Sequence, residues 1–378
     1  MKIAVNFLPF GPLVGGAGRY AFNMLRSMAQ AAPEDEFILI RRDSCASVDT
    51  FEYKNVRHIV RTVADKGASA RIYEEQVQFP GLLRRNGADV LFAPSVSFPI
   101  CSPVPVVATI HDVAYLHVPR KYPLVRRAYV KYLTALSARH AARVLTVSEF
   151  SKRELMETFG LSPDRISVTY NAVDPVFQRT PPSQDVSASL ERLGVRLPYA
   201  LFVGAVEPSK NIPVLFRAIS QLKGAGTPVR LILTDTLGWS KRRVRTEHAL
   251  RDIEDYVSFV RPESDEDLVR LYLGATVLLH PSQYEGFGLP VLEAMSVGIP
   301  VIAAPAEAVR EIAGDAVLWA DPFDADIWAL QIRRCMSDRE LCDRLRLGGR
   351  DRAKEFTWEK SALVALDACH EVATEASR

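Results

Sequence analysis

Short apolar runs alternate with longer segments of helical periodicity along almost the whole chain. Several runs, such as residues 90–93 and 277–280, are apolar at successive positions instead of alternating with polar residues. This pattern is typical of strands covered on both faces, and its alternation with helices predicts parallel sheets with crossover helices. The predicted strands are residues 3–7, 37–40, 56–60, 90–93, 104–109, 144–147, 166–170, 200–203, 230–234, 257–260, 277–280 and 301–304.

The alternation weakens once, between residues 180 and 198. The run Thr180-Pro181-Pro182 and the polar residues after it are unsuited to a helix or a central strand. A chain of 378 residues also exceeds the ~250–300 residues that one hydrophobic core commonly serves. We therefore predict an α/β protein with two doubly wound domains, residues 1–180 and 197–357, facing each other across a cleft. The last helix, residues 358–378, is expected to pack back on the first domain.

Composition narrows the class of protein. Hydrophobic residues make up 48% of the chain and charged residues 24%, which is typical of a soluble globular protein. The five cysteines form no Cys-x-x-Cys pair or Cys/His cluster, so neither a disulfide framework nor a zinc site is predicted. No basic-then-apolar leader precedes the first strand, and the uncharged window 91–110 contains four prolines that would break a membrane-spanning helix. We therefore expect a cytoplasmic protein.

The net charge is +2, but basic residues outnumber acidic ones in residues 1–180 and the balance reverses in the remainder. A basic cluster supplies much of this excess: Arg120, Lys121, Arg126, Arg127, Lys131, Arg139 and Arg143. The cluster is either a solvated helix face or a surface for an anionic membrane or lipid-linked phosphate, which would place the protein peripherally at the inner membrane face. Nucleic acid is not an expected partner, because no recognition motif accompanies the charge.

Two segments of the first half carry candidate chemistry. The run Gly15-Gly16-Ala17-Gly18 follows a strand and opens a helix, where amides and the helix dipole favour an anion. A tight turn is the alternative, and the spacing matches neither Gly-x-Gly-x-x-Gly nor a Walker motif. His111-Asp112 closes the strand 104–109, so His111 faces either the ligand crevice or a structural partner. Ser151 and Glu154 have capping-box spacing and are interpreted as structural.

In the second half, Lys210 follows the strand 200–203 and opens the next helix. Its charge suits a diphosphate leaving group, although an ordinary surface lysine is the alternative.

The densest segment is residues 280–295. After the strand 277–280 come two glycines and then Pro290, which is favoured in a first helical turn, so free amides are available for phosphate. Glu285 precedes this helix and Glu293 lies one turn inside it. A carboxylate can accept two hydrogen bonds from a vicinal diol, so the segment favours a phosphate flanked by hydroxyls over phosphate alone.

These segments, in order along nearly the whole chain, resemble the large family of retaining glycosyltransferases with the GT-B fold (glycosyltransferase family 4). The most specific match is the family's Glu-x7-Glu motif, at Glu285 and Glu293. Supporting matches are Gly15-Gly16, His111-Asp112, residues 148–154, Asn171-Ala172-Val173-Asp174, residues 207–211 and Phe356-Thr357-Trp358.

The resemblance implies that the N-terminal domain binds the acceptor and the C-terminal domain binds a nucleotide-sugar donor. It assigns Glu285 to the hydroxyls of the donor sugar, Glu293 to the ribose and Lys210 to the diphosphate, and it places His111 near the reacting carbon. The expected catalytic residues are therefore His111, Lys210 and Glu285. The expected donor-binding residues are Gly15, Gly16, Gly204, Ser209, Gly286, Phe287, Gly288, Leu289 and Glu293, and the expected acceptor contacts are Arg19 and Tyr115. No metal or other cofactor is expected, and the acidic runs 265–267 and 324–326 are predicted to be helix starts.

Three positions depart from the family's pattern. Ala205 stands where many members carry Arg, and Ser209 stands where a second basic residue often precedes the lysine. Arg261 replaces a glycine that often contacts the base. Phosphate binding therefore depends more on Lys210 and backbone amides, and the identity of the base stays open.

The resemblance implies a hexosyltransferase that retains the configuration of the sugar, by same-face attack with the diphosphate accepting the acceptor's proton. Similar bacterial enzymes build cell-surface polysaccharides from GDP-mannose, so transfer of mannose from GDP-mannose to a glycan or lipid-linked acceptor is the expected reaction. A UDP-sugar or other donor stays open, as does an epimerase or hydrolase on the same fold. A two-lobed binding protein is disfavoured, because paired glutamates and Lys210 would have no reason to coexist.

Overall fold

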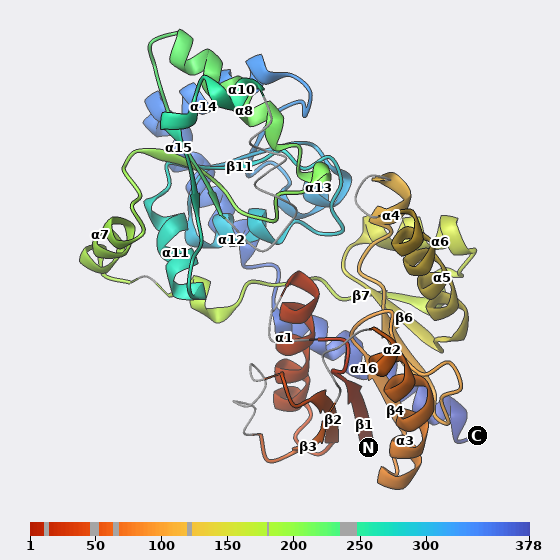
Figure 1. The fold of residues 1–378 in the computed structure, drawn as a ribbon. Coiled ribbons are helices and arrows are strands. Elements are labelled where there is room, and N and C mark those ends of the chain that lie inside the picture. Colours follow the sequence, from red (N-terminus) through yellow and green to blue (C-terminus); the bar gives the residue numbers. More distant parts are fainter. Residues whose placement is uncertain (11–14, 46–52, 63–67, 119–122, 180, 235–247) are drawn as a thin grey trace. The chain divides into compact units, whose positions relative to one another are not determined.

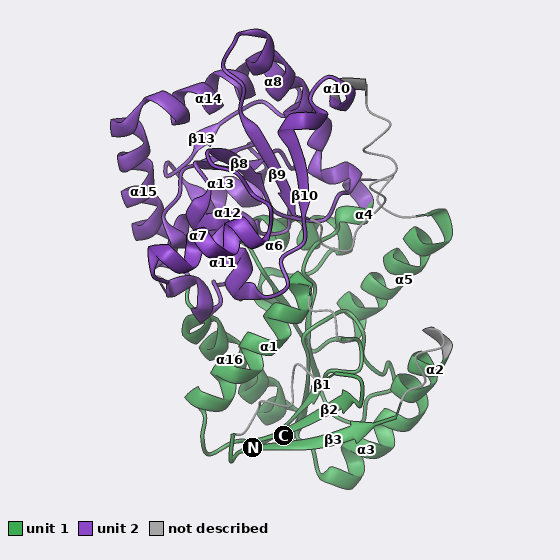
Figure 2. Cartoon of the chain, turned by 60° about the vertical axis from the view of Figure 1, so that its left-hand side comes forward, with its two compact units in different colours: residues 1–115, 122–171, 357–378 green, residues 116–121, 172–356 purple. Residues whose placement is uncertain are grey.

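The computed structural model describes residues 1–378 except 11–14, 46–52, 63–67, 119–122, 180 and 235–247. The chain forms two compact units (Figure 2). Unit 1 comprises Met1–Tyr115, Tyr122–Asn171 and Thr357–Arg378, and unit 2 comprises Leu116–Lys121 and Ala172–Phe356.

A helix occupies part of the segment between the two predicted domains, residues 1–180 and 197–357. The main chain passes from unit 1 to unit 2 between Asn171 and Ala172, upstream of residues 180–197. Residues 183–192 form helix α7 (Ser183–Arg192), which begins directly after Pro182. The two prolines therefore precede a helix, because a fixed φ and a missing N–H are both compatible with a helix start.

Unit 1 is built on a seven-stranded parallel sheet with the order β3-β2-β1-β4-β5-β6-β7 (Figure 1). Its strands are β1 (Lys2–Asn6), β2 (Glu36–Arg42), β3 (Val56–Arg61), β4 (Val90–Ala93), β5 (Val106–Thr109), β6 (Arg143–Thr146) and β7 (Ile166–Val168). Every residue of β4 and β5 is buried, which explains why these strands read as continuous apolar runs. The uncharged window 91–110 thus forms two strands, and among the described residues no helix combines the length and hydropathy needed to span a membrane.

The helices of unit 1 include one pair that joins the two ends of the chain. Helix α1 (Gly16–Ala31) packs against α16 (Trp358–Ala376), and α16 also lies along β4, β5, β6 and β7. The ring of Tyr20 meets that of Trp358 edge to face, with centroids 6.1 Å apart. The other helices are α2 (Ala68–Tyr73), α3 (Phe79–Asn86), α5 (Leu124–His140) and α6 (Glu149–Phe159), and the short α4 (Ala114–His117) lies at the boundary of the unit.

Unit 2 repeats the same winding in a six-stranded parallel sheet with the order β10-β9-β8-β11-β12-β13. Its strands are β8 (Tyr199–Phe202), β9 (Arg230–Thr234), β10 (Val257–Val260), β11 (Val277–His280), β12 (Val301–Ala303) and β13 (Leu318–Trp319). The two sheets confirm the predicted α/β architecture of two doubly wound units. Only β13 was absent from the predicted strands, because two residues are too few to show a period.

Helices cover both faces of the unit 2 sheet. They are α8 (Ile212–Gly224), α10 (His248–Arg251), α11 (Asp265–Gly274), α12 (Leu289–Val297), α13 (Glu307–Ala313), α14 (Ala325–Ser337) and α15 (Arg339–Ala353). Helices α8 and α14 pack together over a core in which Trp328 is fully buried. The acidic runs are helix starts as predicted: Ser264 caps α11 and Asp324 caps α14.

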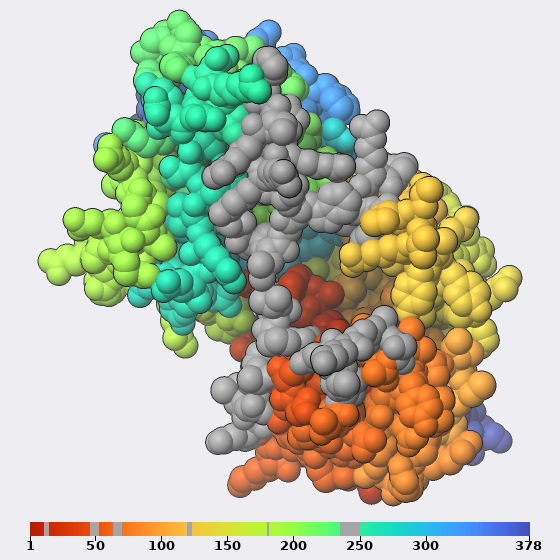
Figure 3. All heavy atoms as spheres, in the orientation of Figure 1, coloured from red at the N-terminus to blue at the C-terminus, as the bar shows by residue number. Residues whose placement is uncertain are grey.

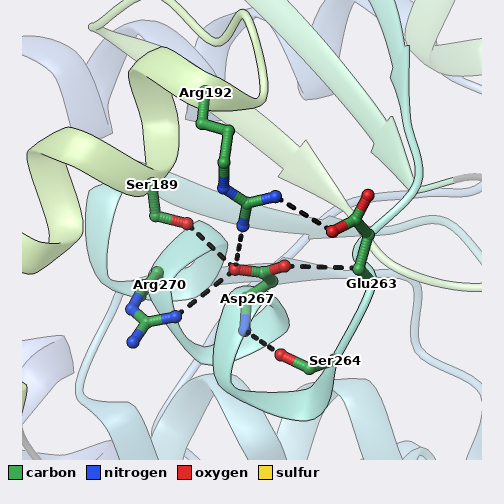
Figure 4. Close-up of polar contacts among 6 residues, drawn as sticks. All are labelled: Ser189, Arg192, Glu263, Ser264, Asp267 and Arg270. Carbon is green, nitrogen blue, oxygen red and sulfur yellow. Dashed lines mark hydrogen bonds and ion pairs between the residues drawn. The ribbon is translucent and has the colours of Figure 1, made fainter.

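Helix α7 is fixed to α11 by a charged cluster (Figure 4). Asp267 Oδ1 accepts hydrogen bonds from Arg192 at 2.6 Å, Ser189 at 3.0 Å and Arg270 at 3.3 Å. The two helices approach so closely that a Cβ on Gly274 would lie 2.6 Å from a leucine methyl group of α7. Helix α7 is therefore an integral part of unit 2.

Candidate active site

Two loops of unit 2 meet where the strand order of its sheet reverses. Strands β8 and β11 are neighbours, and the chain continues from β8 toward one edge and from β11 toward the other. Loops beyond the carboxyl ends of strands form the ligand crevice at such a point. The backbone N–H of Gln283, after β11, donates to the carbonyl of Ser209, after β8, at 3.0 Å. The sheet thus joins two segments that lie far apart in the sequence.

Lys210 and Glu285 form an ion pair at this junction. Lys210 Nζ lies 2.5 Å from Glu285 Oε1, and the two side chains are only 15% and 14% exposed. The fully buried ring of His280, the last residue of β11, adds a third group, with Nε2 3.1 Å from the same carboxylate oxygen. That distance suits a charge interaction, but the ring nitrogens lack hydrogen-bond geometry with any described residue.

The carboxylate of Glu285 is held in its charged form. Burial by itself would raise the pKa of Glu285, but the charge of Lys210 and the contacts of the carboxylate with Lys210 and His280 outweigh burial and lower the pKa well below its usual value. Glu285 is therefore an acceptor of hydrogen bonds at neutral pH and not a proton donor. Sequence reasoning placed His280 in this segment without giving it a role, although its position at a strand end is the same signal that singled out His111.

The loop after β8 keeps Lys210 in place. Gly204 has a φ of +146°, a conformation that favours glycine, and its N–H donates to Thr234 Oγ1 at 3.1 Å. Ser209 is 2% exposed and its hydroxyl donates to Glu207 at 2.7 Å. The Ser209 hydroxyl thus bonds within its own loop, and Lys210 is the basic side chain that this loop contributes.

The start of α12 is set by a glycine and a proline. Gly288 precedes the helix with a φ of +107°, and a Cβ there would lie 3.1 Å from Val309 Cγ2. Leu289 and Pro290 form the first positions of α12, and the N–H of Val291 donates to the Gly288 carbonyl at 3.0 Å. The positive end of the helix dipole lies at this end of α12, which suits an anion.

Glu293 lies inside α12 and is 5% exposed. The hydroxyl of Tyr272, from α11, donates to Glu293 Oε2 at 2.7 Å and orients the carboxylate. Tyr272 is a residue that sequence reasoning missed, since only the packing of α11 on α12 brings the two together. Phe287 is 4% exposed and meets Phe356 edge to face at 6.0 Å, so its side chain belongs to the core of unit 2 and its backbone is what faces the loop.

In unit 1, the glycine run sits at the start of α1. Gly15 caps the helix with an extended backbone, and a Cβ on it would meet no atom within 4 Å. Gly16 is the first residue of α1, and the N–H of Arg19 donates to the Gly15 carbonyl at 2.9 Å. Within the described part of the chain, no side chain caps this helix. The helix begins where the sequence predicts it, and the binding of an anion there stays a prediction.

His111 follows β5 and is held by two groups. Its Nε2 lies 3.1 Å from the carbonyl oxygen of Pro94, and its ring meets that of Tyr20 edge to face at 4.9 Å. Burial lowers the pKa of His111, against the opposing effects of the Pro94 carbonyl and the Asp112 charge. A carbonyl only accepts, so Nε2 carries the proton and Nδ1 of the neutral ring is a hydrogen-bond acceptor.

Comparison with known proteins identifies the family. The model for "Glycosyl transferases group 1" matches residues 191–352, and that for "Glycosyltransferase Family 4" matches residues 14–177. O-antigen chain mannosyltransferase B of Escherichia coli is 34% identical over 266 residues, which are 69% of each chain. The chain belongs to this glycosyltransferase family.

Two other relatives of the glycosyltransferase carry the names of different transfer reactions. O-antigen chain mannosyltransferase RfbU of Salmonella typhimurium is 25% identical over 87% of this chain and 89% of its own length. D-inositol 3-phosphate glycosyltransferase of Nocardioides is 31% identical, but the match spans 58% of this chain and only 51% of that protein.

Solved structures agree on the fold. WaaG, a glycosyltransferase of lipopolysaccharide biosynthesis, has a TM-score of 0.73 at 18% identity over 98% of this chain and 99% of its own. Anabaena HepE, in complex with UDP-glucose, has a TM-score of 0.73 at 18% identity over 97% and 99%. These likenesses establish the GT-B fold of the glycosyltransferase.

Two expectations about unit 1 of the glycosyltransferase change with the structure. The cap of α6 is Ser148, whose Oγ accepts from the Ser151 N–H at 3.0 Å, so the predicted capping box at Ser151 and Glu154 lies three residues too late. Tyr115, expected at the acceptor, is 2% exposed, and burial raises the pKa of its hydroxyl to about 12. Its side chain is therefore inside unit 1, and a role at the acceptor stays a prediction.

The basic cluster of residues 120–143 divides into two groups. Arg120 and Lys121 lie outside the described residues, while Arg143 pairs with Glu371 at 2.7 Å and Arg127 donates to the Tyr115 carbonyl at 2.8 Å. Arg126, Lys131 and Arg139 are exposed on α5, whose atoms lie on the surface of unit 1 (Figure 3, amber to yellow). The cluster is therefore partly structural and partly a basic helix face.

Proposed function

We propose that this glycosyltransferase moves mannose from GDP-mannose to a glycan or lipid-linked oligosaccharide in the synthesis of a cell-surface polysaccharide, with retention of configuration. Three relatives named as mannosyltransferases support the sugar, and two of them are O-antigen chain mannosyltransferases. The structural observation that carries a nucleotide-sugar donor is the Lys210–Glu285 pair beside the start of α12. A cation, the positive end of a helix and a charged carboxylate together suit a diphosphate flanked by hydroxyls.

In the proposed step, the bond between the anomeric carbon of the sugar and the diphosphate oxygen breaks. A bond from an acceptor hydroxyl oxygen forms on the same face of the sugar, and the acceptor's proton passes to the leaving diphosphate. Lys210 and the amides of α12 offset the negative charge that grows on this leaving group. Glu285 accepts hydrogen bonds from sugar hydroxyls, Glu293 accepts them from the ribose, and His111 accepts one from the sugar through Nδ1.

A UDP-sugar or other nucleotide-sugar donor is the second candidate. The D-inositol 3-phosphate glycosyltransferases among the relatives and the UDP-glucose complex of HepE favour it, since neither is named for mannose. Ala205 and Arg261 are two of the three positions where this chain departs from the family's pattern. An epimerase or hydrolase would use the same donor without an acceptor.

The exposed edge of α5 supports an acceptor that is presented at a membrane. Leu124 and Val125 are 81% and 85% exposed, and Tyr132 is 64% exposed, on a helix without any acidic residue. Apolar and aromatic side chains flanked by basic ones suit an anionic lipid surface. The protein should therefore sediment with phosphatidylglycerol vesicles and not with phosphatidylcholine vesicles. A Leu124→Ser/Val125→Ser variant that still sediments fully with phosphatidylglycerol would contradict this.

The donor is tested by binding and by product chemistry. Thermal melting with GDP, UDP, ADP and dTDP should show the largest stabilisation with GDP, because a ligand that binds only the folded state raises its stability. Proton NMR of the product formed from GDP-mannose should show an α-linked mannose. A larger increase in melting temperature with UDP than with GDP would indicate a UDP-sugar donor instead of GDP-mannose. An inverted anomer would refute retention. Equal nucleotide release without acceptor would favour a hydrolase.

A further inference from the structure

A buried carboxylate lies at the point of strand reversal in unit 1. Glu75 is 1% exposed, and its Oε1 accepts a hydrogen bond from Asn6 Nδ2 at 2.6 Å while its Oε2 accepts one from Ser97 Oγ at 2.5 Å. Asn6 ends β1 and Ser97 follows β4, which are the two neighbouring strands where the order reverses. Glu75 therefore ties together both loops of the ligand-binding edge of this sheet.

The helix that carries Glu75 is built to point it inward. Residues 74–78 form a π-helical segment between α2 and α3, and such insertions occur frequently at functional sites. The neighbouring Glu74 pairs instead with Arg61, at 2.5 Å. Two adjacent carboxylates of one segment thus serve different partners: Glu74 meets the end of β3, and Glu75 meets the two strands where the order reverses.

The bonds of Asn6 leave its amide one orientation. Its Oδ1 accepts from the Leu8 N–H at 3.1 Å, and its Nδ2 donates to the Ser97 carbonyl at 2.9 Å as well as to Glu75. A flipped amide would bring its oxygen against a carbonyl and a carboxylate, which both only accept. The network therefore fixes the backbone of residue 97 from two sides.

This network is connected to His111 by a short stretch of chain. Ser97 lies three residues after Pro94, and the Pro94 carbonyl is the group that meets His111 Nε2 at 3.1 Å. The stretch 94–97 is thus held by Glu75 at one end and holds the imidazole at the other. The Pro94 carbonyl decides which ring nitrogen of His111 carries the proton, because a carbonyl only accepts.

We propose that Glu75 is a positioning residue for His111, which it serves by holding the stretch 94–97 so that the imidazole keeps its proton on Nε2 and presents Nδ1 as an acceptor. The catalytic consequence rests on the proposed role of His111, but the tautomer itself does not. Groups that orient a functional imidazole are typically worth about 10- to 100-fold in activity.

The test uses the full-length protein labelled with ¹⁵N-histidine. The protein has seven histidines, and the signals that disappear in His111→Asn are those of His111. Long-range proton–nitrogen correlation spectra distinguish the two tautomers. Glu75→Ala should convert the single Nε2–H form into a mixture. Glu75→Gln should keep that form, since its oxygen accepts from Asn6 and its amide nitrogen donates to Ser97 Oγ. Glu74→Ala is the matched control, because it removes the adjacent carboxylate and leaves the network intact.

Transfer assays give the second readout. Glu75→Ala should lower kcat by about 10-fold or more while the KM for the donor stays within about twofold, and Glu75→Gln should rescue most of the activity. Glu75→Ala should add nothing in the His111→Asn background. If Glu75→Ala does not fold, Ser97→Ala replaces it, because that change removes one hydroxyl only.

An unchanged His111 tautomer in folded Glu75→Ala or Ser97→Ala would overturn the proposal, as would an equal tautomer change in Glu74→Ala. Because the spectra need no turnover, they decide the positioning role even if the proposed donor proves wrong. A tautomer change without loss of transfer would instead refute the catalytic consequence.

Discussion

Replacing Lys210 by methionine should destabilise unit 2, because it leaves the buried carboxylate of Glu285 without its main partner. The two charged atoms lie 2.5 Å apart in side chains about one-seventh exposed, as their 15% and 14% show. Removing one member of such a buried pair costs about 3–5 kcal/mol, and most of that cost is the uncompensated charge left behind. The expected loss in the free energy of unfolding at pH 7 is therefore about 3 kcal/mol or more.

The double variant Lys210→Met/Glu285→Gln separates this charge effect from simple loss of packing. Because no unpaired charge remains, it should recover about 2 kcal/mol relative to Lys210→Met, within the range of coupling energies between contacting residues. Transfer activity should stay lost in both variants, since neither retains the cation for the diphosphate. The double variant is thus expected to regain stability without regaining transfer activity.

Urea unfolding followed by tryptophan fluorescence measures the effect, with the buried Trp328 reporting on unit 2. Lys223→Met is the matched control, because Lys223 is an exposed lysine of the same unit, on α8. Its contacts with the Asp252 carbonyl and the Tyr256 ring are exposed, so its loss should cost at most about 1 kcal/mol. A Lys210→Met protein as stable as the parent, or a double variant no more stable than Lys210→Met, would refute the reasoning. Normal transfer activity in Lys210→Met would remove its assigned role.

Three further changes probe the packing around the site. Tyr272→Phe removes the 2.7 Å hydrogen bond to Glu293 and should cost about 1–3 kcal/mol of stability while weakening nucleotide binding, as melting with and without nucleotide would show. Gly274→Ala should cost about 1–3 kcal/mol in urea unfolding, because its Cβ would lie 2.6 Å from a leucine methyl group, and a neutral result would contradict the close approach of α7 and α11. Burial alone would raise the pKa of Asp267, but the hydrogen bond from Arg192 outweighs it and the folded pKa is lowered from 3.8. Asp267 therefore contributes stability above about pH 4 that is lost as the pH falls through its folded pKa, and Asp267→Asn should flatten this part of the acid limb in melts from pH 7 to pH 3.

The strands were readable from the sequence because their residues are buried on both faces. Runs of successive apolar residues, such as those of β4 and β11, need no partner to be recognised, and all twelve predicted runs fall on strands of the structure. The boundary between the units was harder to read, because prolines are common both in linkers and at helix starts. Pro182 precedes α7, and only the packing of that helix on α11 shows that it belongs to unit 2.

In the candidate site, too, some features follow from local sequence and others only from tertiary packing. The sequence by itself placed Lys210 and Glu285 after strands, and it placed free amides at the start of a helix, because these are local properties of short segments. That the two side chains meet follows from β8 lying beside β11, which the order of residues does not state.

Tyr272 beside Glu293, and Glu75 beside Asn6 and Ser97, were decided by tertiary structure alone. Sequence patterns record how each segment meets solvent, whereas a buried polar contact depends on which segments become neighbours. The sequence therefore determined the family, the strands and the positions of Lys210, Glu285 and Glu293 along the chain. The packing of the sheets and helices decided which groups these side chains contact, because a buried charge is stable only where another group pairs with it.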